Sequence, residues 1–379
     1  MPTECSPLRV LMVTARYYPY MGGVETHLYE VGRRLAQAGV EVTVLSMDVS
    51  GRLPAVEESE GVQILRVRAW PANKDYYFSP AIYRIITRGL WDLVHCQGYH
   101  TLVAPVAMLA AWRANIPYVL TIHSGGDVSS LRKALRGMQW AMLRPLLSRA
   151  RKLIAMSRFE VDFFSERLRL PAERFVIIPS GAHLPRVPGS AEGATNGAND
   201  SRLIVSIGRL VRYKGHQRVI AALPKVLEQV PDTRLRIAGV GPYESTLQKM
   251  ARRLGVAERV EIRPFPPEDR GGMAALIARA DLVTLLSEYE CLGLAALEAL
   301  ALQRPLLVTG TSALQELADR GLARAVPLES TPDEVAAAVI NQLRQPLVPL
   351  NVELPTWDNC VARLLALYQA ITRRVPCAS

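Results

Sequence analysis

The sequence lacks the features that mark secreted, membrane-spanning and disordered proteins. Its 379 residues include only five cysteines, which are scattered without the spacing of a metal site or a disulfide framework. No apolar run approaches the roughly 20 residues that a membrane-spanning helix needs, and Val10–Val13 is too short for a signal peptide core. Hydrophobic residues make up 49% of the chain, which excludes disorder. We therefore expect a reduced, cytoplasmic, globular protein.

Acidic residues are scarce in the first half of the chain. Residues 1–186 contain 23 Lys and Arg against 15 Asp and Glu, a balance of +8, whereas the whole chain has a net charge of +10. This asymmetry favours an anionic partner or surface for the first half. Nucleic acid is not expected as that partner, because the sequence contains no recognition motif for it.

Short runs rich in Val, Ile and Leu alternate with longer helical patterns such as residues 24–38 and 103–113. This alternation is typical of a parallel sheet covered by helices on both faces. The chain is also too long for one ordinary core, so we expect two domains. The strand-like runs are Arg9–Ala15, Glu41–Ser46, Ile64–Arg68, Leu93–Cys96, Tyr118–Ile122, Leu153–Met156, Val176–Ile178, Leu203–Ser206, Arg234–Ala238, Val260–Ile262, Leu282–Leu285 and Leu306–Val308.

The alternation stops once, over residues 185–201, which hold Gly, Ala, Asn and Pro but almost no large apolar residue. We interpret this stretch as a linker, with a surface loop inside one domain as the alternative. The sequence thus predicts an α/β protein with two doubly wound Rossmann-like domains, residues 1–184 and 202–355, facing across a cleft. Ligands of such sheets bind beyond the carboxyl ends of the strands, so the cleft is the expected site.

A glycine pair, Gly22 and Gly23, follows the first strand and precedes an amphipathic helix. Without side chains, the pair would let a phosphate approach the amides at the helix start. A plain tight turn is the alternative. The pattern is not G-x-G-x-x-G, and no acidic residue follows a second strand in the ribose-binding role, so a dinucleotide cofactor is poorly supported.

Three residues at the start of the second domain, Gly208, Arg209 and Lys214, lie between a strand and a helix. Arg provides a planar fork of donors and Lys a compact charge, and together they could neutralise a diphosphate without a metal. The alternative is two solvated surface cations. Their position at the carboxyl end of a strand favours the functional interpretation.

Two glutamates, Glu290 and Glu298, lie eight positions apart among small apolar residues. Eight helical residues rise about 12 Å, so the carboxylates are too far apart to share a proton and could instead bind opposite ends of one long polar ligand. The amides of Cys291–Leu294 would lie between them at a helix start, where a phosphate is stabilised. An exposed helical glutamate is the alternative for Glu298. If it is buried, an unpaired carboxylate is costly, and a ligand hydroxyl is a suitable partner.

The segment TIHSGGD ends another strand of the first domain and places His123 at its carboxyl edge. A single histidine is more often structural, but a neutral imidazole here could bond a sugar hydroxyl or stabilise developing charge. Asp127 is as well explained by a helix N-cap as by a catalytic role.

Residues 128–159 contain eight basic residues and no acidic one, and leucines and methionines recur near helical spacing. A basic amphipathic helix over 129–152 could contact an anionic membrane or a lipid-linked phosphate at the inner face of the membrane. The alternative is an ordinary helix that packs on its sheet with a solvated basic face.

These motifs in this order resemble the family-4 retaining glycosyltransferases, which have the GT-B fold, over nearly the whole chain. The resemblance rests most specifically on SIGRLVRYKG, LRIAGVGPYESTL and YECLGLAALEALALQRPLLVT, with the Glu-x7-Glu spacing from Glu290 to Glu298. It makes residues 1–184 the acceptor domain, 202–355 the nucleotide-sugar donor domain and 356–379 a C-terminal helix that crosses back to the first domain.

The resemblance implies glycosyl transfer from a UDP- or GDP-sugar to an acceptor hydroxyl, with retention and without a metal or other cofactor. Arg209 and Lys214 would hold the diphosphate, Glu290 the sugar and Glu298 the ribose. The catalytic residues would be His123, Arg209, Lys214 and Glu290. The donor-binding residues would be Gly22, Gly23, Gly208, Arg209, Lys214, Gly239, Cys291, Leu292, Gly293, Leu294 and Glu298.

The chain departs from the family pattern at several positions. Cys291–Leu294 stands where the family has Phe-Gly-Leu, and Gln303-Arg304-Pro305 replaces a Gly before Pro. These changes remove no implied catalytic group but would alter which base or sugar fits. The competing hypotheses are a nucleotide-sugar epimerase or phosphorylase on the same fold, and a non-catalytic membrane-associated binding module.

Overall fold

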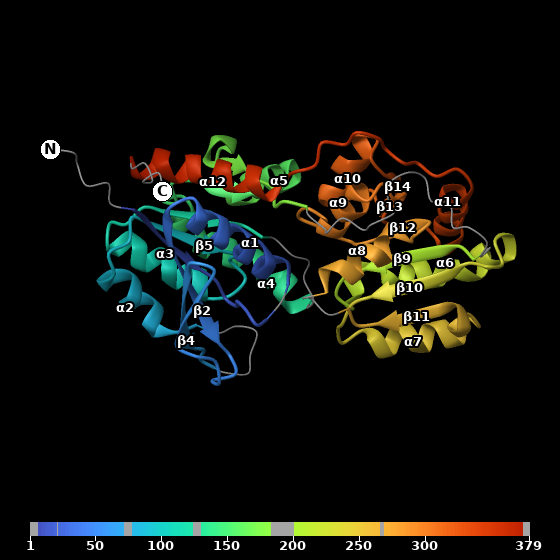
Figure 1. Ribbon diagram of the computed structural model, residues 1–379, viewed down its shortest axis with the longest axis horizontal. Helices are drawn as coiled ribbons and strands as arrows, with labels where there is room; N and C mark the ends of the chain where they lie inside the picture. Colours follow the sequence, from blue (N-terminus) through green and yellow to red (C-terminus); the bar gives the residue numbers. More distant parts are fainter. Residues whose placement is uncertain are drawn as a thin grey trace. The chain divides into compact units, whose positions relative to one another are not determined.

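The computed structural model of the protein describes residues 7–20, 22–71, 78–123, 130–182, 201–265 and 269–373, with the side chains of 130–136 excepted. The chain divides into two compact units (Figure 1). Unit 1 comprises Met1–Ser124, Ala134–Gly181 and Pro355–Ser379, and unit 2 comprises Gly125–Lys133 and Ala182–Leu354. Asp127 and all of the expected linker except Ser201 lie outside the described residues.

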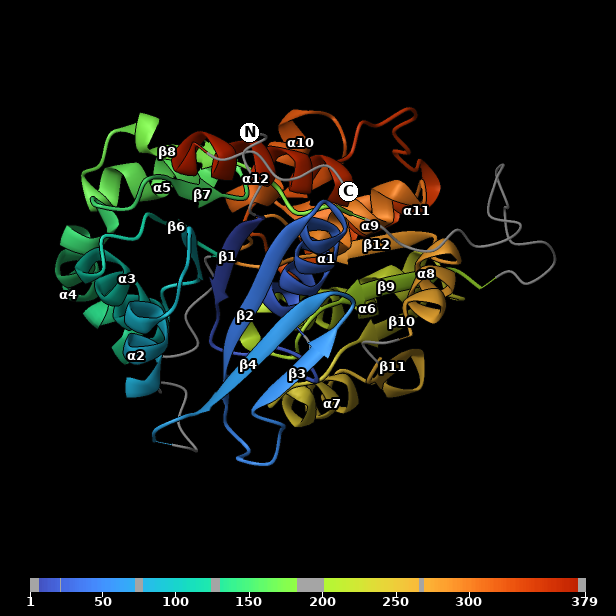
Figure 2. The same ribbon diagram turned by 60° about the vertical axis from the view of Figure 1, so that its left-hand side comes forward.

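Unit 1 is built on an eight-stranded sheet in the order β3-β4-β2-β1-β5-β6-β7-β8. All neighbouring strands pair in parallel except β3, which runs antiparallel to β4 at one edge (Figure 2). The strands are β1 Leu8–Val13, β2 Val40–Asp48, β3 Val56–Ser59, β4 Val62–Arg68, β5 Leu93–Gln97, β6 Tyr118–Thr121, β7 Leu153–Ala155 and β8 Phe175–Ile177.

Helices cover both faces of this sheet because successive side chains of its buried strands point to opposite sides. In β1, Val10 and Met12 pack in one core with α1 and α12, whereas Leu11 and Val13 pack in a second core with α2, α3, α4 and α5. The helices of unit 1 are α1 Gly23–Gln37, α2 Pro80–Arg88, α3 Val103–Arg113, α4 Ser130–Leu147, α5 Arg158–Leu168, the short 3-10 helix η1 Ala172–Arg174, and α12 Trp357–Thr372.

The last helix, α12, belongs to unit 1 although it follows unit 2 in the sequence. It packs against α1 and buries Leu364 and Tyr368 completely. At its first turn Asp358 Oδ1 accepts a hydrogen bond from Arg34 Nε of α1 at 3.0 Å. The chain therefore completes the core of its first unit with its last helix.

Unit 2 is built on a six-stranded parallel sheet in the order β11-β10-β9-β12-β13-β14. Neighbouring residues of β9 again divide between two cores, Ile204 with α6, α7 and α11, and Val205 with α8, α9 and α10. The elements are β9 Leu203–Ile207, η2 Arg212–Lys214, α6 His216–Gln229, β10 Arg234–Ala238, α7 Glu244–Arg253, η3 Ala257–Arg259, β11 Val260–Arg263, α8 Arg270–Ala278, β12 Leu282–Leu285, α9 Leu294–Ala301, β13 Leu306–Thr309, α10 Ser312–Asp319, β14 Arg324–Val326 and α11 Pro332–Arg344.

The predicted α/β class with two doubly wound, Rossmann-like units is confirmed. In each sheet the strand order reverses beside the first strand of the unit, between β1 and β5 in unit 1 and between β9 and β12 in unit 2. The loops that leave these pairs of strands diverge to opposite faces and leave room for a ligand. Within the described ranges, the structure contains no helix that is long and apolar enough to span a membrane.

Candidate active site

The loops after β9 and β12 bring together two charged residues of the predicted donor site, Lys214 and Glu290. Lys214 ends η2 in the first loop and Glu290 lies in the second, 76 residues further along the chain, yet Lys214 Nζ lies 2.6 Å from Glu290 Oε1. The two side chains retain 18% and 11% of their exposure, so the pair is largely shielded from solvent. The structure thus joins two residues that the sequence places in the same site.

A serine scaffold fixes the position of Glu290. Ser287 Oγ donates to Glu290 Oε1 at 2.8 Å, and the Glu290 N–H donates to Ser312 Oγ at 2.9 Å. The Glu290 carbonyl in turn accepts a hydrogen bond from the Ala313 N–H at 3.2 Å. Sequence reasoning missed both serines, because a hydroxyl between two elements gives no local signal.

The run from Cys291 to Gly293 leads directly into α9, which begins at Leu294. Gly293 has φ +71°, and a Cβ there would lie 2.9 Å from Leu314 Cδ2, so glycine is favoured by both conformation and space. The first amides of a helix have no partner inside it and carry partial positive charge. This turn can therefore present backbone donors to an anion beside the Lys214–Glu290 pair.

Glu298 lies inside α9 and its side chain is only 5% exposed, so the alternative of an exposed helical glutamate is wrong. Its Oε1 accepts a hydrogen bond from Arg270 Nη2, at the first residue of α8. Burial raises the pKa of the Glu298 carboxyl, and Arg270 opposes this rise. The sequence suggested only a ligand hydroxyl as partner for a buried Glu298, whereas the structure provides an arginine that lies 28 residues earlier in the chain.

Arg209 is held by its own loop. Its Nη2 donates to Tyr213 Oη at 2.6 Å, and its carbonyl oxygen lies 3.3 Å from His216 Nε2. His216 is buried at the start of α6, with Nδ1 2.8 Å from Ser206 Oγ, and burial lowers its pKa to about 4. This uncharged histidine, which the sequence did not single out, therefore anchors the loop that carries Arg209 and Lys214.

The structure explains why two positions of unit 2, Gly208 and Gly239, are glycine. A Cβ on Gly239 would lie 1.9 Å from the Gly208 carbonyl oxygen, so the two backbones pass in direct contact. Gly208 has φ +147°, which side chains rarely adopt, and its Cβ position faces Lys214 Cδ at 3.7 Å. Both glycines thus shape the loop that carries Lys214.

In unit 1, His123 follows β6 with the left-handed φ of 45°. Its Nε2 lies 2.7 Å from Gln97 Oε1, at the end of β5. Since an amide oxygen only accepts, Nε2 carries the proton and Nδ1 retains its lone pair. Burial is the main reason that the pKa of His123 lies well below its ordinary value, so the ring is neutral.

A second histidine lies against His123. The ring of His27, on α1, packs edge-to-face with that of His123 at a centroid distance of 5.0 Å. Its Nδ1 lies 2.8 Å from Ser180 Oγ, and burial lowers its pKa to about 4. Within the described structure, His27 Nε2 and Gln97 Nε2 are buried without a hydrogen-bond partner. Sequence reasoning missed His27 and Gln97, which become neighbours of His123 only through the fold.

The glycine pair lies at the start of α1, where Gly22 is the N-cap and Gly23 the first helical residue. No side chain caps this end of the helix. A Cβ on Gly23 would meet nothing within 4 Å, whereas one on Gly22 would meet only the flexible end of Glu25. The packing of the described residues therefore does not require glycine at Gly23.

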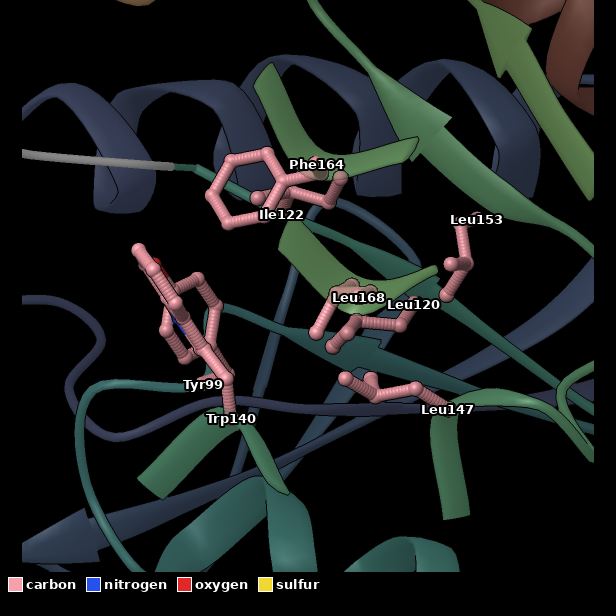
Figure 3. Close-up of a pocket in the computed structure, with 8 residues that line it drawn as sticks. All are labelled: Tyr99, Leu120, Ile122, Trp140, Leu147, Leu153, Phe164 and Leu168. Carbon is pink, nitrogen blue, oxygen red and sulfur yellow. The ribbon is translucent and has the colours of Figure 1, made fainter. Parts of the chain in front are cut away.

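Unit 1 also contains a small apolar cavity of about 10 Å³ (Figure 3). Its polar lining atoms are few, and Trp140 Nε1 has no hydrogen-bond partner in the part of the chain that the structure describes. Such a lining offers little to a sugar or a phosphate. The lining residues are Tyr99, Leu120, Ile122, Trp140, Leu147, Leu153, Phe164 and Leu168.

Both halves of the chain match known families of glycosyltransferases. Residues 21–186 match the family described as Glycosyltransferase Family 4, and residues 192–353 match the family described as Glycosyl transferases group 1. A glycogen synthase of Mycobacterium tuberculosis is 30% identical over 341 residues, which cover 83% of this chain and 81% of that relative.

Solved structures share the fold at lower sequence identity. The sucrose-phosphate synthase of Thermosynechococcus elongatus has a TM-score of 0.72 and 19% identity, with 97% of this chain and 96% of that chain covered. Alr3699/HepE of Anabaena, in complex with UDP-glucose, has a TM-score of 0.68 and 18% identity, with 97% and 98% covered. The fold of this chain is therefore that of the GT-B glycosyltransferases.

Proposed function

Because the chain belongs to the glycosyltransferases of Family 4 and group 1, we propose that it moves a sugar from a UDP- or GDP-linked donor to an acceptor hydroxyl with retention of anomeric configuration. The observation that carries this proposal is the Lys214–Glu290 pair beside the start of α9, with Glu298 further along the same helix. The binding of UDP-glucose by the Anabaena protein supports a nucleoside-diphosphate sugar as donor.

The proposed donor site uses three kinds of group in unit 2. Arg209 and Lys214 neutralise the diphosphate, and the amides that open α9 bond its oxygens. Glu290 accepts hydrogen bonds from the sugar. The hydrogen bond from Ser287 holds its carboxylate in place for this role. Glu298 binds the ribose. Gly22 and Gly23 of unit 1 let the backbone approach the diphosphate.

The proposed reaction breaks the bond between the anomeric carbon and the diphosphate oxygen. A new bond forms from that carbon to the acceptor oxygen on the same face, and the acceptor proton passes to the departing diphosphate. Arg209 and Lys214 stabilise the negative charge that develops on the leaving group, so no metal is needed. His123 lies by the transferred sugar, where its neutral ring can bond a hydroxyl without repelling positive charge on the anomeric carbon.

The donor half of the proposal is tested by Lys214→Ala and Glu290→Gln. We expect Lys214→Ala to lower kcat by about 10²–10³, the effect of removing one group that stabilises transition-state charge. Glu290→Gln should also lower transfer, because it removes the ionised hydrogen-bond acceptor for the sugar. Transfer from UDP- and GDP-sugars is measured, and NMR assigns the anomeric configuration of the product. Lys225→Ala is the matched control, because Lys225 is an exposed lysine on α6 that pairs only weakly with Glu228. Near wild-type transfer by Lys214→Ala, or an inverted product, would contradict the proposal.

The acceptor half of the proposal rests on α4. Met138 and Met142 are 58% and 73% exposed, whereas Leu143 and Leu147 of the same helix are buried, so residues 137–147 of α4 present apolar side chains outward as well as inward. Exposed apolar side chains on a surface helix are a feature of helices that lie in a membrane interface.

Unit 1 also has exposed cationic and aromatic side chains on α4, just after it and on α3. Arg149 lies 4.7 Å over the ring of Trp112, which is 41% exposed on α3. Arg144, on α4, is exposed too. Exposed cationic and apolar side chains are the two kinds of group with which a peripheral protein binds an anionic bilayer. The acceptor is then a lipid-linked or membrane-borne glycoconjugate, and the enzyme is peripheral at the membrane.

Vesicle co-sedimentation tests this half of the proposal. Vesicles of phosphatidylglycerol should bind the protein at low salt and release it at high salt, whereas phosphatidylcholine vesicles should bind it poorly. Replacement of Met138 and Met142 by Ser should weaken binding. Replacement of Leu350 by Ser is the control, because Leu350 is 71% exposed in unit 2. The membrane contact is excluded if phosphatidylglycerol vesicles do not bind the protein at low salt.

A further inference from the structure

The ion pair between Arg270 and Glu298 is a feature that the proposed donor site does not explain. Glu298 is 5% exposed, and its Oε1 accepts a hydrogen bond from Arg270 Nη2. Arg270 is the first residue of α8 and is 38% exposed, so its guanidinium lies near the surface while the carboxylate is inside. The helix entry is fixed, because Asp269 caps α8 by accepting a hydrogen bond from the Gly272 N–H at 2.8 Å.

Arg270 is the main charged group that determines whether the buried Glu298 carboxyl is ionised. The elements with the most extensive contacts to α9 are α8, β12 and β13, and α10 shares its core. α8, β12, β13 and α9 itself carry Arg270 and Glu298 as their titratable residues, and α10 carries Glu316 and Asp319, but Arg270 is the charged group that acts on the Glu298 carboxyl. A carboxylate in an apolar environment is disfavoured unless an opposite charge compensates it. No other described residue than Arg270 donates a hydrogen bond to the Glu298 carboxylate.

We propose that Arg270 is a positioning residue for nucleotide binding, which holds Glu298 ionised and presents its second carboxylate oxygen to a ribose hydroxyl of the donor. This inference rests on the proposed function, because it takes Glu298 as the ribose-binding group. Arg270 occupies Oε1 and leaves Oε2 for the ligand. An ionised carboxylate forms stronger hydrogen bonds with hydroxyls than a protonated one. Affinity for the ribose thus depends on an arginine that need not touch it.

Removal of the arginine should make nucleotide binding depend on pH. Burial already raises the pKa of Glu298, and Arg270 is the group that lowers it. In Arg270→Gln the pKa therefore rises further, so the protonated share of the carboxyl should grow as the pH falls from 9 to 6. We expect the affinity of this variant for the nucleoside diphosphate to fall about tenfold from pH 9 to pH 6, the difference between a charged and a neutral hydrogen bond. The wild type should change little over that range.

Calorimetric titration tests the inference with UDP and GDP and with their 2′-deoxy and 3′-deoxy analogues. The wild type should lose about tenfold in affinity when a ribose hydroxyl is removed, and Arg270→Gln should show this discrimination at pH 9 but not at pH 6. Arg270→Lys, which keeps the charge, should restore a flat pH profile. Glu298→Gln should bind weakly at every pH. Arg279→Gln is the matched control, because Arg279 directly follows the last residue of the same helix and is exposed.

Carbon-13 NMR of the glutamate carboxyls separates this inference from the proposed function. The Glu298 signal is the one absent from Glu298→Gln, and its titration should move to higher pH in Arg270→Gln whether or not a nucleotide binds. An equal loss of affinity at all pH values in Arg270→Gln, or an unmoved Glu298 titration, overturns the role of Arg270. A wild type that binds no nucleotide, with the Glu298 titration moved as expected, overturns the proposed function and the ribose role but leaves Arg270 as the group that holds Glu298 ionised.

Discussion

Burial determines the charge of several single side chains in this protein. His27 in unit 1 and His216 in unit 2 are held neutral inside the fold, and burial lowers the pKa of each from 6.5 to about 4. In an unfolded chain both would titrate near 6.5. Their protonation is therefore linked to folding.

This linkage predicts that stability falls in acid. Between pH 6.5 and pH 4 the unfolded chain binds protons at His27 and His216 that the folded chain does not, so the free energy of unfolding falls as pH falls. A difference of one in pKa corresponds to about 1.4 kcal/mol. Each histidine should therefore add on the order of 3 kcal/mol to the free energy of unfolding above pH 6.5, and this contribution is lost as the pH falls to 4. Urea unfolding at pH 5, 6 and 7 measures the slope. His27→Gln should flatten it, and an unchanged slope in this variant would contradict the assignment.

Two glycines that the sequence treats alike should respond differently to alanine. Gly239→Ala places a Cβ 1.9 Å from the Gly208 carbonyl oxygen, and because backbone must then shift, we expect a loss of at least about 2 kcal/mol. Gly23→Ala meets nothing within 4 Å and adds helix propensity, so its stability should match or exceed that of the wild type. Urea unfolding compares the two. Equal stability of both variants would show that the Gly239 contact can relax.

At the scale of single residues, the sequence identifies candidate site residues but not the partners that the fold gives them. Lys214, Glu290 and Glu298 stand out by type and by position after expected strands. Arg270, Ser287 and Gln97 do not, because each is an ordinary polar residue whose importance arises from a contact across the fold, such as that of Gln97 with His123 over 26 positions. A single sequence holds no record of such contacts.

At the scale of elements, hydrophobic runs predict the buried strands well. The run expected at Tyr118–Ile122 is β6, Tyr118–Thr121, and that expected at Leu282–Leu285 is β12 with the same bounds. The strands that escape prediction lie at sheet edges. All four residues of β3 are exposed, and β14 has three residues, so neither has the apolar run that signals a buried strand. Edge strands form because a neighbour offers free backbone groups.

The packing of α12 on α1 gives a prediction at this scale. Leu364 is 1% exposed in the core that joins these helices, and Leu364→Ala should cost about 2–5 kcal/mol. Amide hydrogen exchange should then rise in α1, whereas α6 and α11 in unit 2 should be unaffected. Leu367→Ala, at a partly buried position of the same helix, should have a smaller effect. Exchange that rises equally in both units would contradict the division of the cores.

At the scale of the whole molecule, length and the repeated strand–helix alternation predict two doubly wound sheets, and the structure has them. Composition also predicts the excess of basic residues in the first half, but not the surface that they form. The outward orientation of Met138 and Met142 could not be predicted, since a methionine at helical spacing is as typical of a core as of a surface. The fold decides which side of α4 the sheet covers.

The central claim is that the chain binds a nucleoside-diphosphate sugar through Glu298 without a metal, and a thermal-shift screen tests it most directly. UDP, GDP, ADP, CMP and NAD are each added to the wild type and to Glu298→Gln, with and without EDTA. A ligand at 100 times its Kd adds about 2.7 kcal/mol of stability. We predict that UDP or GDP raises the Tm of the wild type in EDTA and raises that of Glu298→Gln less. No shift with any diphosphate, a shift with NAD alone, or a shift abolished by EDTA would contradict the account.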